Sequence, residues 1–177
     1  MRNKLTYATL PLEVKTLAAK NLGIGVLEAL LSQDHEYFLI MQVSHGIFIG
    51  FAIYHFTEKD NDGNWTNGII DIVCIDFLYR GEGHGTALTF AVLKKMAANK
   101  IRRIEILLKM LSVQDRDSEI GISYAGSDKM LKNLGFKQVH TFHNYFEDLS
   151  ETLNYECAFC GSIPDLCIAV LYAINEP

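Results

Sequence analysis

Several residue types and patterns are scarce in this chain of 177 residues, and each scarcity narrows the class of protein. There are three prolines and no repeat or low-complexity segment, so no stretch is predicted to link separate domains. No basic run exceeds a pair, as in Lys94-Lys95 and Arg102-Arg103, and the formal net charge is −5. The sequence therefore shows no electrostatic footprint for a nucleic acid, and we expect no nucleic-acid partner.

Long apolar runs are also missing. No stretch approaches the ~20 residues of a membrane span, and the segment Met1–Tyr7 lacks the apolar core of a signal peptide. We therefore expect a cytoplasmic protein with no membrane partner, whose four cysteines stay reduced. Hydrophobic residues make up 49% of the chain, which is enough for one well-buried domain over residues 1–177.

The hydrophobic pattern predicts strands and helices that alternate along the chain. The predicted strands are 5–9, 37–43, 47–56, 69–76, 102–108, 136–146 and 167–174. The predicted helices are 12–21, 25–32, 86–100 and 128–134, and Gly135 is predicted to end the last of them as its C′ residue. Ser44-His45-Gly46 favours a hairpin turn, and Gly50 favours a β-bulge in the strand that follows. The segments 58–67 and 112–127 are polar and are predicted to be loops.

The segment 69–100 organises the rest of the chain. A strand of apolar and β-branched residues is followed by glycines at alternate positions, Gly81, Gly83 and Gly85, and then by the long helical pattern. Glycines let the backbone approach a ligand closely and adopt positive φ. The first N–H groups of a helix have no partner within the helix. This arrangement predicts a backbone site for an anion, with a tight turn that binds nothing as the alternative.

The spacing of the glycines distinguishes among the known types of anion-binding loop. A nucleotide-hydrolase phosphate loop would need Lys-Ser or Lys-Thr after the glycines, and a dinucleotide fingerprint would need a glycine where Thr86 stands. What remains is Arg-x-x-Gly-x-Gly at Arg80, Gly83 and Gly85. It resembles the pyrophosphate-binding motif of the Gcn5-related N-acetyltransferase (GNAT) family, in which this loop holds the diphosphate of acetyl-coenzyme A.

A second resemblance lies in Met130–Phe136, which is similar to the family's Leu-Tyr-x-x-Leu-Gly-Phe element. With the order of the elements, the resemblance is strongest over residues 37–146. It implies an α/β GNAT (acyl-CoA N-acyltransferase) fold, with a mixed, mostly antiparallel sheet of six to seven strands, splayed central strands and flanking helices. It also implies a single N-acetyltransferase domain over 1–177.

The resemblance implies an acyltransferase that uses acetyl-CoA as co-substrate. The acetyl group would move to a primary amine by direct attack, and the acceptor would be a small molecule, a protein lysine or a protein N-terminus. The acidic composition leans toward a cationic acceptor. A homodimer is left open.

The resemblance also assigns roles to residues around the glycines. The backbone N–H of Ile75 would polarise the acetyl carbonyl, and Val73 and Cys74 would flank the pantetheine. The diphosphate would be held by Arg80, Gly81, Glu82, Gly83, His84, Gly85 and Thr86. A cysteine inside an apolar strand is typical of a core, so Cys74 is not expected to be a nucleophile. The His84 side chain is expected to face solvent.

The catalytic positions depart from the family pattern. The tyrosine that often serves as general acid is replaced by Leu131, an asparagine is replaced by Tyr124, and the carboxylate of the central strand is replaced by Ile69. Asp71 is the nearest acid on the face that strict alternation shares with Ile75, and it is the predicted base. Tyr124 is the predicted acid.

The motif Cys157-Ala-Phe-Cys160-Gly161 is typical of half a zinc site. Cys167 with His140 or His143 would complete four ligands, but a redox pair or two buried thiols fit the same residues, and no metal is predicted. Two alternatives to the enzyme therefore stay open: an acyl-CoA-binding module without catalysis, and a zinc-stabilised interaction protein.

Overall fold

The computed structural model describes residues 4–23, 25–111, 121–142 and 167–175, and for 109–111, 121–126 and 167–168 it describes the backbone alone. The chain forms two compact units. One comprises Met1–Ile104 with Asn175–Pro177, and the other comprises Glu105–Ile174.

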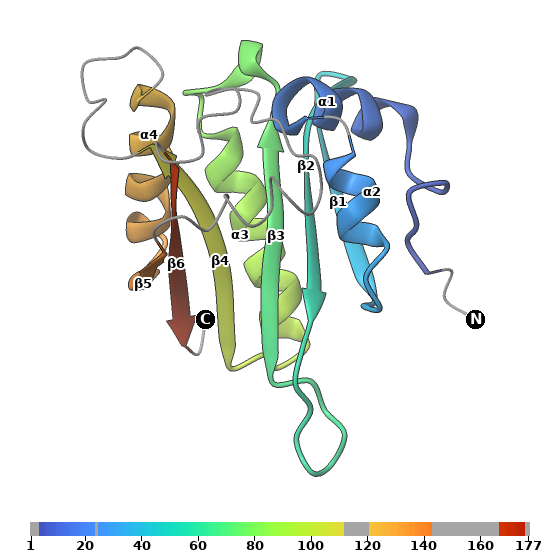
Figure 1. Ribbon diagram of the computed structural model, residues 1–177, viewed down its shortest axis with the longest axis vertical. Coiled ribbons are helices and arrows are strands. Elements are labelled where there is room, and N and C mark those ends of the chain that lie inside the picture. Colours follow the sequence, from blue (N-terminus) through green and yellow to red (C-terminus); the bar gives the residue numbers. More distant parts are fainter. Residues whose placement is uncertain (1–3, 24, 112–120, 143–166, 176–177) are drawn as a thin grey trace. The chain divides into compact units, whose positions relative to one another are not determined.

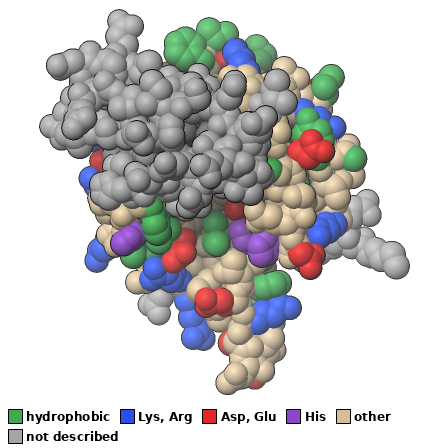
Figure 2. Space-filling view, in the orientation of Figure 1, with side chains coloured by type: hydrophobic (Ala, Val, Ile, Leu, Met, Phe, Trp, Pro, Cys, Tyr) green, Lys and Arg blue, Asp and Glu red, His purple; other side chains and the backbone are tan. Residues whose placement is uncertain are grey.

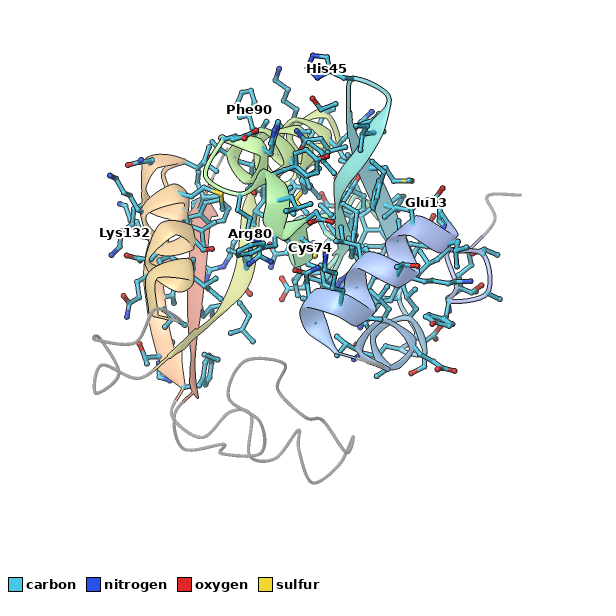
Figure 3. All side chains as sticks on the ribbon, turned by 90° about the horizontal axis from the view of Figure 1, so that it is seen from above. Glu13, His45, Cys74, Arg80, Phe90 and Lys132 are labelled. Atoms are coloured by element: carbon cyan, nitrogen blue, oxygen red, sulfur yellow. The ribbon has the colours of Figure 1, made fainter. Side chains whose placement is uncertain are left out.

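The first unit contains three antiparallel strands in the order β1-β2-β3, with helices on both faces (Figure 1). Its elements are α1 (Leu12–Leu22), α2 (Val26–Leu31), β1 (Tyr37–Ser44), β2 (Ile47–Phe56), β3 (Asn67–Ile75), the 3₁₀ helix η1 (Phe77–Tyr79) and α3 (His84–Ala98). Seen from above, α1 and α2 lie on one face of these strands and α3 lies on the other (Figure 3). The sequence predicted each of these α-helices and strands but not η1.

The helical spacing of apolar residues explains why α1 and α2 lie on the sheet. Val14, Leu17 and Ala18 form one buried stripe of α1. They join a hydrophobic cluster that includes Leu27 and Leu31 of α2 and, from the strands, Tyr37, Phe51, Ile53 and Cys74. This cluster is the core between the sheet and its first two helices, and burial of its apolar area stabilises their docking.

The opposite face is covered by α3. Leu88, Val92 and Met96 recur every fourth residue and are buried. A Cβ built on Gly68 of β3 would lie 2.9 Å from the sulfur of Met96, so a larger residue there would require the end of the Met96 side chain to move. Close packing of α3 fixes the position of its first turn, which follows the glycine loop.

The pairing of β1 with β2 contains a bulge. Its register shifts so that Ile49 has no partner on β1, next to Gly50 where the sequence predicted a bulge. A Cβ on Gly50 would lie 2.5 Å from Cδ1 of Ile75 and 2.6 Å from the carbonyl oxygen of Cys74. Glycine is therefore required at this position for β2 to lie against the end of β3.

The second unit holds most of β4 (Arg103–Leu111), then α4 (Gly121–Asn133), β5 (Lys137–Phe142) and β6 (Cys167–Asn175). The strand order is β4-β6-β5, and β5 pairs with β6 in antiparallel orientation. Gly135 ends the helix with φ +91°, as predicted for a C′ glycine. Phe136 N donates to Leu131 O at 3.0 Å and Gly135 N donates to Lys132 O at 3.0 Å, which is a Schellman motif.

Two predictions of secondary structure were wrong. Residues 5–9 form no strand, and residues 7–9 form a turn, because the Thr9 hydroxyl accepts from Thr6 N and donates to Thr6 O and so satisfies them locally. Helix α4 begins at Gly121 and not at Asp128. The glycines and serines at its start have low helix propensity and concealed it in the sequence.

Charge is mixed on the described surface. On the face shown in Figure 2, acidic and basic side chains are interspersed. In the described parts of the chain, no helix is both long and apolar enough to span a membrane.

Candidate functional site

The candidate site begins where β3 ends. Asp76 accepts a hydrogen bond from Leu78 N at 3.1 Å and caps η1. Its own N–H donates to the Ile49 carbonyl at 2.9 Å, beside the bulge in β2. Lys20 of α1 lies 3.8 Å from the Asp76 carboxylate. These contacts hold the turn that leads from the strand into the glycine loop.

The glycine loop is open on its outer side. Gly81 and Gly83 have φ of +86° and +84°, and nothing lies within 4 Å of a Cβ built on either. Gly83 is the N-cap of α3 and supplies no side-chain cap. The first N–H groups of the helix are therefore left for a ligand, and the positive end of the helix dipole favours an anion there.

His84 and Glu82 of the loop are joined to β1. His84 Nδ1 lies 3.2 Å from Gln42 Nε2, and His84 Nε2 lies 3.2 Å from the Glu82 carboxylate. The His84 side chain is 21% exposed. The ring, which was expected to face solvent, is partly exposed and lies beside Gln42 of β1.

The Arg80 guanidinium is turned back into the first unit. Its Nε donates to the Ile75 carbonyl at 3.1 Å, and its Nη2 donates to Asn21 Oδ1 at 2.7 Å. Asn21 is buried and donates to Leu17 O at 2.9 Å. The guanidinium thus ties α1 to the end of β3.

Cys74 belongs to the core, as predicted. It is 3% exposed, and burial raises the pKa of its thiol to about 12. A thiol that stays protonated at neutral pH is a poor nucleophile. Val73 and Ile75 flank Cys74 on β3, and Ile75 is also buried.

A buried carboxylate–imidazole pair lies further back on β3. His55 Nδ1 is 2.8 Å from Asp71 Oδ2, and the two side chains are 5% and 10% exposed. Burial raises the pKa of the Asp71 carboxyl, and the hydrogen bond from His55 opposes that rise. The sequence predicted a role for Asp71 and missed His55.

Asp71 occupies a second β-bulge. Ile53 pairs with Ile72 and Tyr54 pairs with Ile70, so Asp71 is an extra residue on β3. A bulge interrupts the alternation of side chains and re-aims the residue that carries it. Strict alternation would place Asp71 with Ile75; this was wrong, because the bulge directs it to His55.

Two aromatic rings surround the His55 imidazole. The His35 ring stacks on it with centroids 4.5 Å apart and planes at 19°, and the Tyr37 ring meets it edge-on at 5.1 Å. Burial, with a smaller contribution from the Asp71 charge, raises the pKa of Tyr37 to about 12. Tyr37 therefore stays neutral at any physiological pH.

Other predicted residues fall outside what the structure describes. These are Cys157, Cys160 and His143, together with the side chains of Tyr124 and Cys167. The described His140 ring lies 4.5 Å from that of Phe142. Over the described ranges, no group of three or more metal-binding side chains comes together. Leu131, where the family often has tyrosine, is fully buried.

The fold and the open loop can be compared with known proteins. No family model and no curated protein matches the sequence. Solved structures do match. A GNAT-family acetyltransferase from Elizabethkingia anophelis with acetyl-CoA bound has a TM-score of 0.64 and 15% identity, covering 98% of this chain and 95% of that one. The chain has the GNAT fold.

Two further structures share the GNAT fold. The ribosomal-protein-S18-alanine N-acetyltransferase from Escherichia coli has a TM-score of 0.64 and 15% identity, over 98% of this chain and 92% of that one. A Bacillus subtilis acetyltransferase in complex with CoA has a TM-score of 0.65 and 12% identity, over 94% and 93%. The predicted fold class is therefore confirmed. At such identities the likeness is one of fold.

Proposed function

We propose that the chain is an acyltransferase that moves an acetyl group from acetyl-CoA to a primary amine. The observation that carries the proposal is the open glycine loop at the start of α3, with Gly81 and Gly83 in the left-handed conformation. GNAT-fold structures with acetyl-CoA or CoA bound support the choice of ligand. An anion the size of a diphosphate fits backbone N–H groups at such a turn.

The loop from Gly81 to Thr86 would hold the diphosphate mainly through its backbone. Arg80 would act indirectly, because its guanidinium already bonds Ile75 and Asn21. The pantetheine would pass Val73 and Cys74, and the Ile75 N–H would polarise the acetyl carbonyl. That role needs a fixed backbone and no particular side chain.

In the proposed reaction a neutral amine attacks the thioester carbon. A C–N bond forms, the C–S bond breaks and the thiolate of CoA leaves. The amine loses one proton, which Asp71 helps to remove, and the thiolate gains one, for which Tyr124 stays the proposed donor. Positioning of amine and thioester supplies the rest of the rate.

The proposed acceptor is a cationic primary amine, such as a polyamine, an aminoglycoside, a lysine side chain or a protein N-terminus. The net charge of −5 supports a cationic partner. The second candidate function is acyl-CoA binding without catalysis, and the fully buried Leu131 favours it, because leucine has no proton to give. Turnover separates the two.

Calorimetry with Gly83→Val tests the loop. A β-branched side chain at φ +84° strains the backbone and fills the open side of the loop, so CoA affinity should fall about tenfold or more. Gly63→Val is the matched control, because Gly63 has φ +81° with equally open surroundings in the 58–66 loop. Equal CoA affinity in both variants and in the wild type would remove the proposal's main support.

Turnover is measured by mass spectrometry of an amine panel with acetyl-CoA. Spermidine, kanamycin and a lysine peptide represent the proposed acceptors. A mass increase of one acetyl group on any of them identifies a transferase. CoA binding with no product from the whole panel would favour the binding module.

A further inference from the structure

The His55–Asp71 pair is a buried polar contact on β2 and β3, the strands that lead to the proposed site. Its Nδ1–Oδ2 distance is 2.8 Å, and both side chains are at most a tenth exposed. An isolated buried carboxylate is costly, since burial disfavours the charged form. A hydrogen bond to the charged form offsets that cost. In this chain the donor comes from the neighbouring strand, through His55.

Among the described groups that face Asp71, His55 makes the main interaction with its carboxylate. The described titratable groups near it are His55 of β2, Tyr37 of β1 and His35 of the segment before β1. The buried residues of α1 and α2 are apolar apart from Asn21, which bonds Leu17 O and the Arg80 guanidinium. No lysine or arginine of the described residues forms an ion pair with Asp71.

The surrounding structure fixes the orientation of both the Asp71 carboxylate and the His55 imidazole. The bulge at Asp71 turns its carboxylate away from the strict alternation of β3 and toward His55. The imidazole is in turn held by the stacked His35 ring and by the edge of Tyr37. A ring clamped in this way presents Nδ1 to the carboxylate in one orientation.

The order along the strands places Asp71 nearer the proposed acetyl site than His55. Ile75 pairs with Gly50, whereas His55 pairs with Ile69, at the other side of the bulge. His55 therefore stands behind the carboxylate as seen from Ile75. It is placed to support Asp71 and not to contact the thioester.

We propose that His55 is a positioning residue for proton removal, whose Nδ1–H orients the buried Asp71 carboxylate and favours its charged form over its neutral form. This inference rests on the proposed function and adds to it the residue that sets the pH at which the base works. The sequence motif of the family did not include this position. His55 is identified by the bulge at Asp71 and by the contact of the two side chains between β2 and β3.

Two variants at His55 separate orientation from simple packing. His55→Asn keeps an N–H donor close to the place of Nδ1, whereas His55→Phe keeps a ring but removes the donor. In His55→Phe the acidic limb of the kcat/KM profile should move to higher pH, so that kcat/KM at a pH on that limb falls by about tenfold for each unit of displacement. His55→Asn should restore most of the rate at that pH.

A direct measurement does not depend on turnover. Aspartate labelled with ¹³C in the full chain reports the titration of Asp71, assigned with Asp71→Asn. The Asp71 carboxyl should protonate at higher pH in His55→Phe than in the wild type and in His55→Asn. A merely structural role would lower the thermal midpoint of His55→Phe and leave this titration unchanged.

The outcomes are distinguishable. If the wild type acetylates an amine and His55→Phe keeps its rate, pH profile and Asp71 titration, the inference is overturned and the proposed function stands. If the wild type neither binds CoA nor acetylates any amine, the proposed function fails. An unmoved Asp71 titration in His55→Phe then also ends the structural part of the inference.

Discussion

The burial of Asp71 makes the stability of the folded chain depend on pH. Asp71 is 10% exposed and burial raises its pKa, so the folded chain holds the proton more tightly than the unfolded chain does. The tighter proton binding stabilises the folded state in full at any pH below the pKa of Asp71 in the unfolded chain, near 4. This stabilisation is lost as the pH rises through the higher pKa of Asp71 in the folded chain.

Replacement of Asp71 by asparagine should therefore flatten the pH dependence of unfolding. The difference in unfolding free energy between Asp71→Asn and the wild type should grow in the variant's favour as pH rises from about 4. It should grow by about 1.4 kcal/mol for each unit by which the pKa is raised. Urea unfolding between pH 4 and 8 measures it. A difference that is constant with pH would contradict the raised pKa.

At the scale of residues, the sequence predicted what depends on local spacing. The glycines of the loop, the core position of Cys74 and the C′ role of Gly135 follow from neighbours a few positions away. The orientation of Asp71 depends instead on the pairing of β2 with β3, where one extra residue reverses the alternation. For that reason no sequence period showed that His55 would meet Asp71.

Among the elements, β2 and β3 are locked together at Gly50. Since a Cβ there would lie 2.6 Å from the carbonyl of Cys74, the backbone itself must shift to admit alanine. Gly50→Ala should cost about 1–3 kcal/mol of unfolding free energy, as overpacking does. It should also weaken acetyl transfer, because the proposed Ile75 N–H would move.

The control for this effect is Gly46→Ala in the β1–β2 turn. Gly46 has φ +79° with open surroundings, so alanine there meets strain but no clash. It should cost less than Gly50→Ala and leave transfer unchanged. Urea unfolding and acetylation rates are measured for both variants. Equal losses of unfolding free energy in the two would show that the close contact at Gly50 is relieved at little cost.

The elements were predictable where an apolar period or a turn signal marked them. Helices α1 and α3 and strands β1 to β3 carry such signals, and the structure confirms them. The start of α4 carries none, since its first residues include glycine and serine. At its other end Leu131 and Phe136 are buried and belong to the Schellman motif. Residues 5–9 have strand-like composition but form local hydrogen bonds instead.

At the scale of the whole molecule, two short motifs were enough to predict a fold that sequence comparison did not find. The glycine loop and the Leu-Gly-Phe element each mark a junction where backbone conformation is demanding, with glycines at positive φ in both. Such positions restrict sequence more strongly than a core does, because a core accepts many apolar combinations. Solved GNAT-fold structures at 12–15% identity are consistent with that argument.

Ligand binding should stabilise the chain as a whole. A ligand that binds only the folded state adds about 2.7 kcal/mol at a concentration of 100 Kd, which corresponds to roughly 5–10 °C in the thermal midpoint of a chain this size. Acetyl-CoA should therefore raise the midpoint of the wild type and of Gly63→Val by similar amounts. It should raise that of Gly83→Val much less, because the strained loop no longer presents its N–H groups to the diphosphate. Scanning calorimetry at several acetyl-CoA concentrations measures the shift, and an equal shift in Gly83→Val would place the ligand away from the glycine loop.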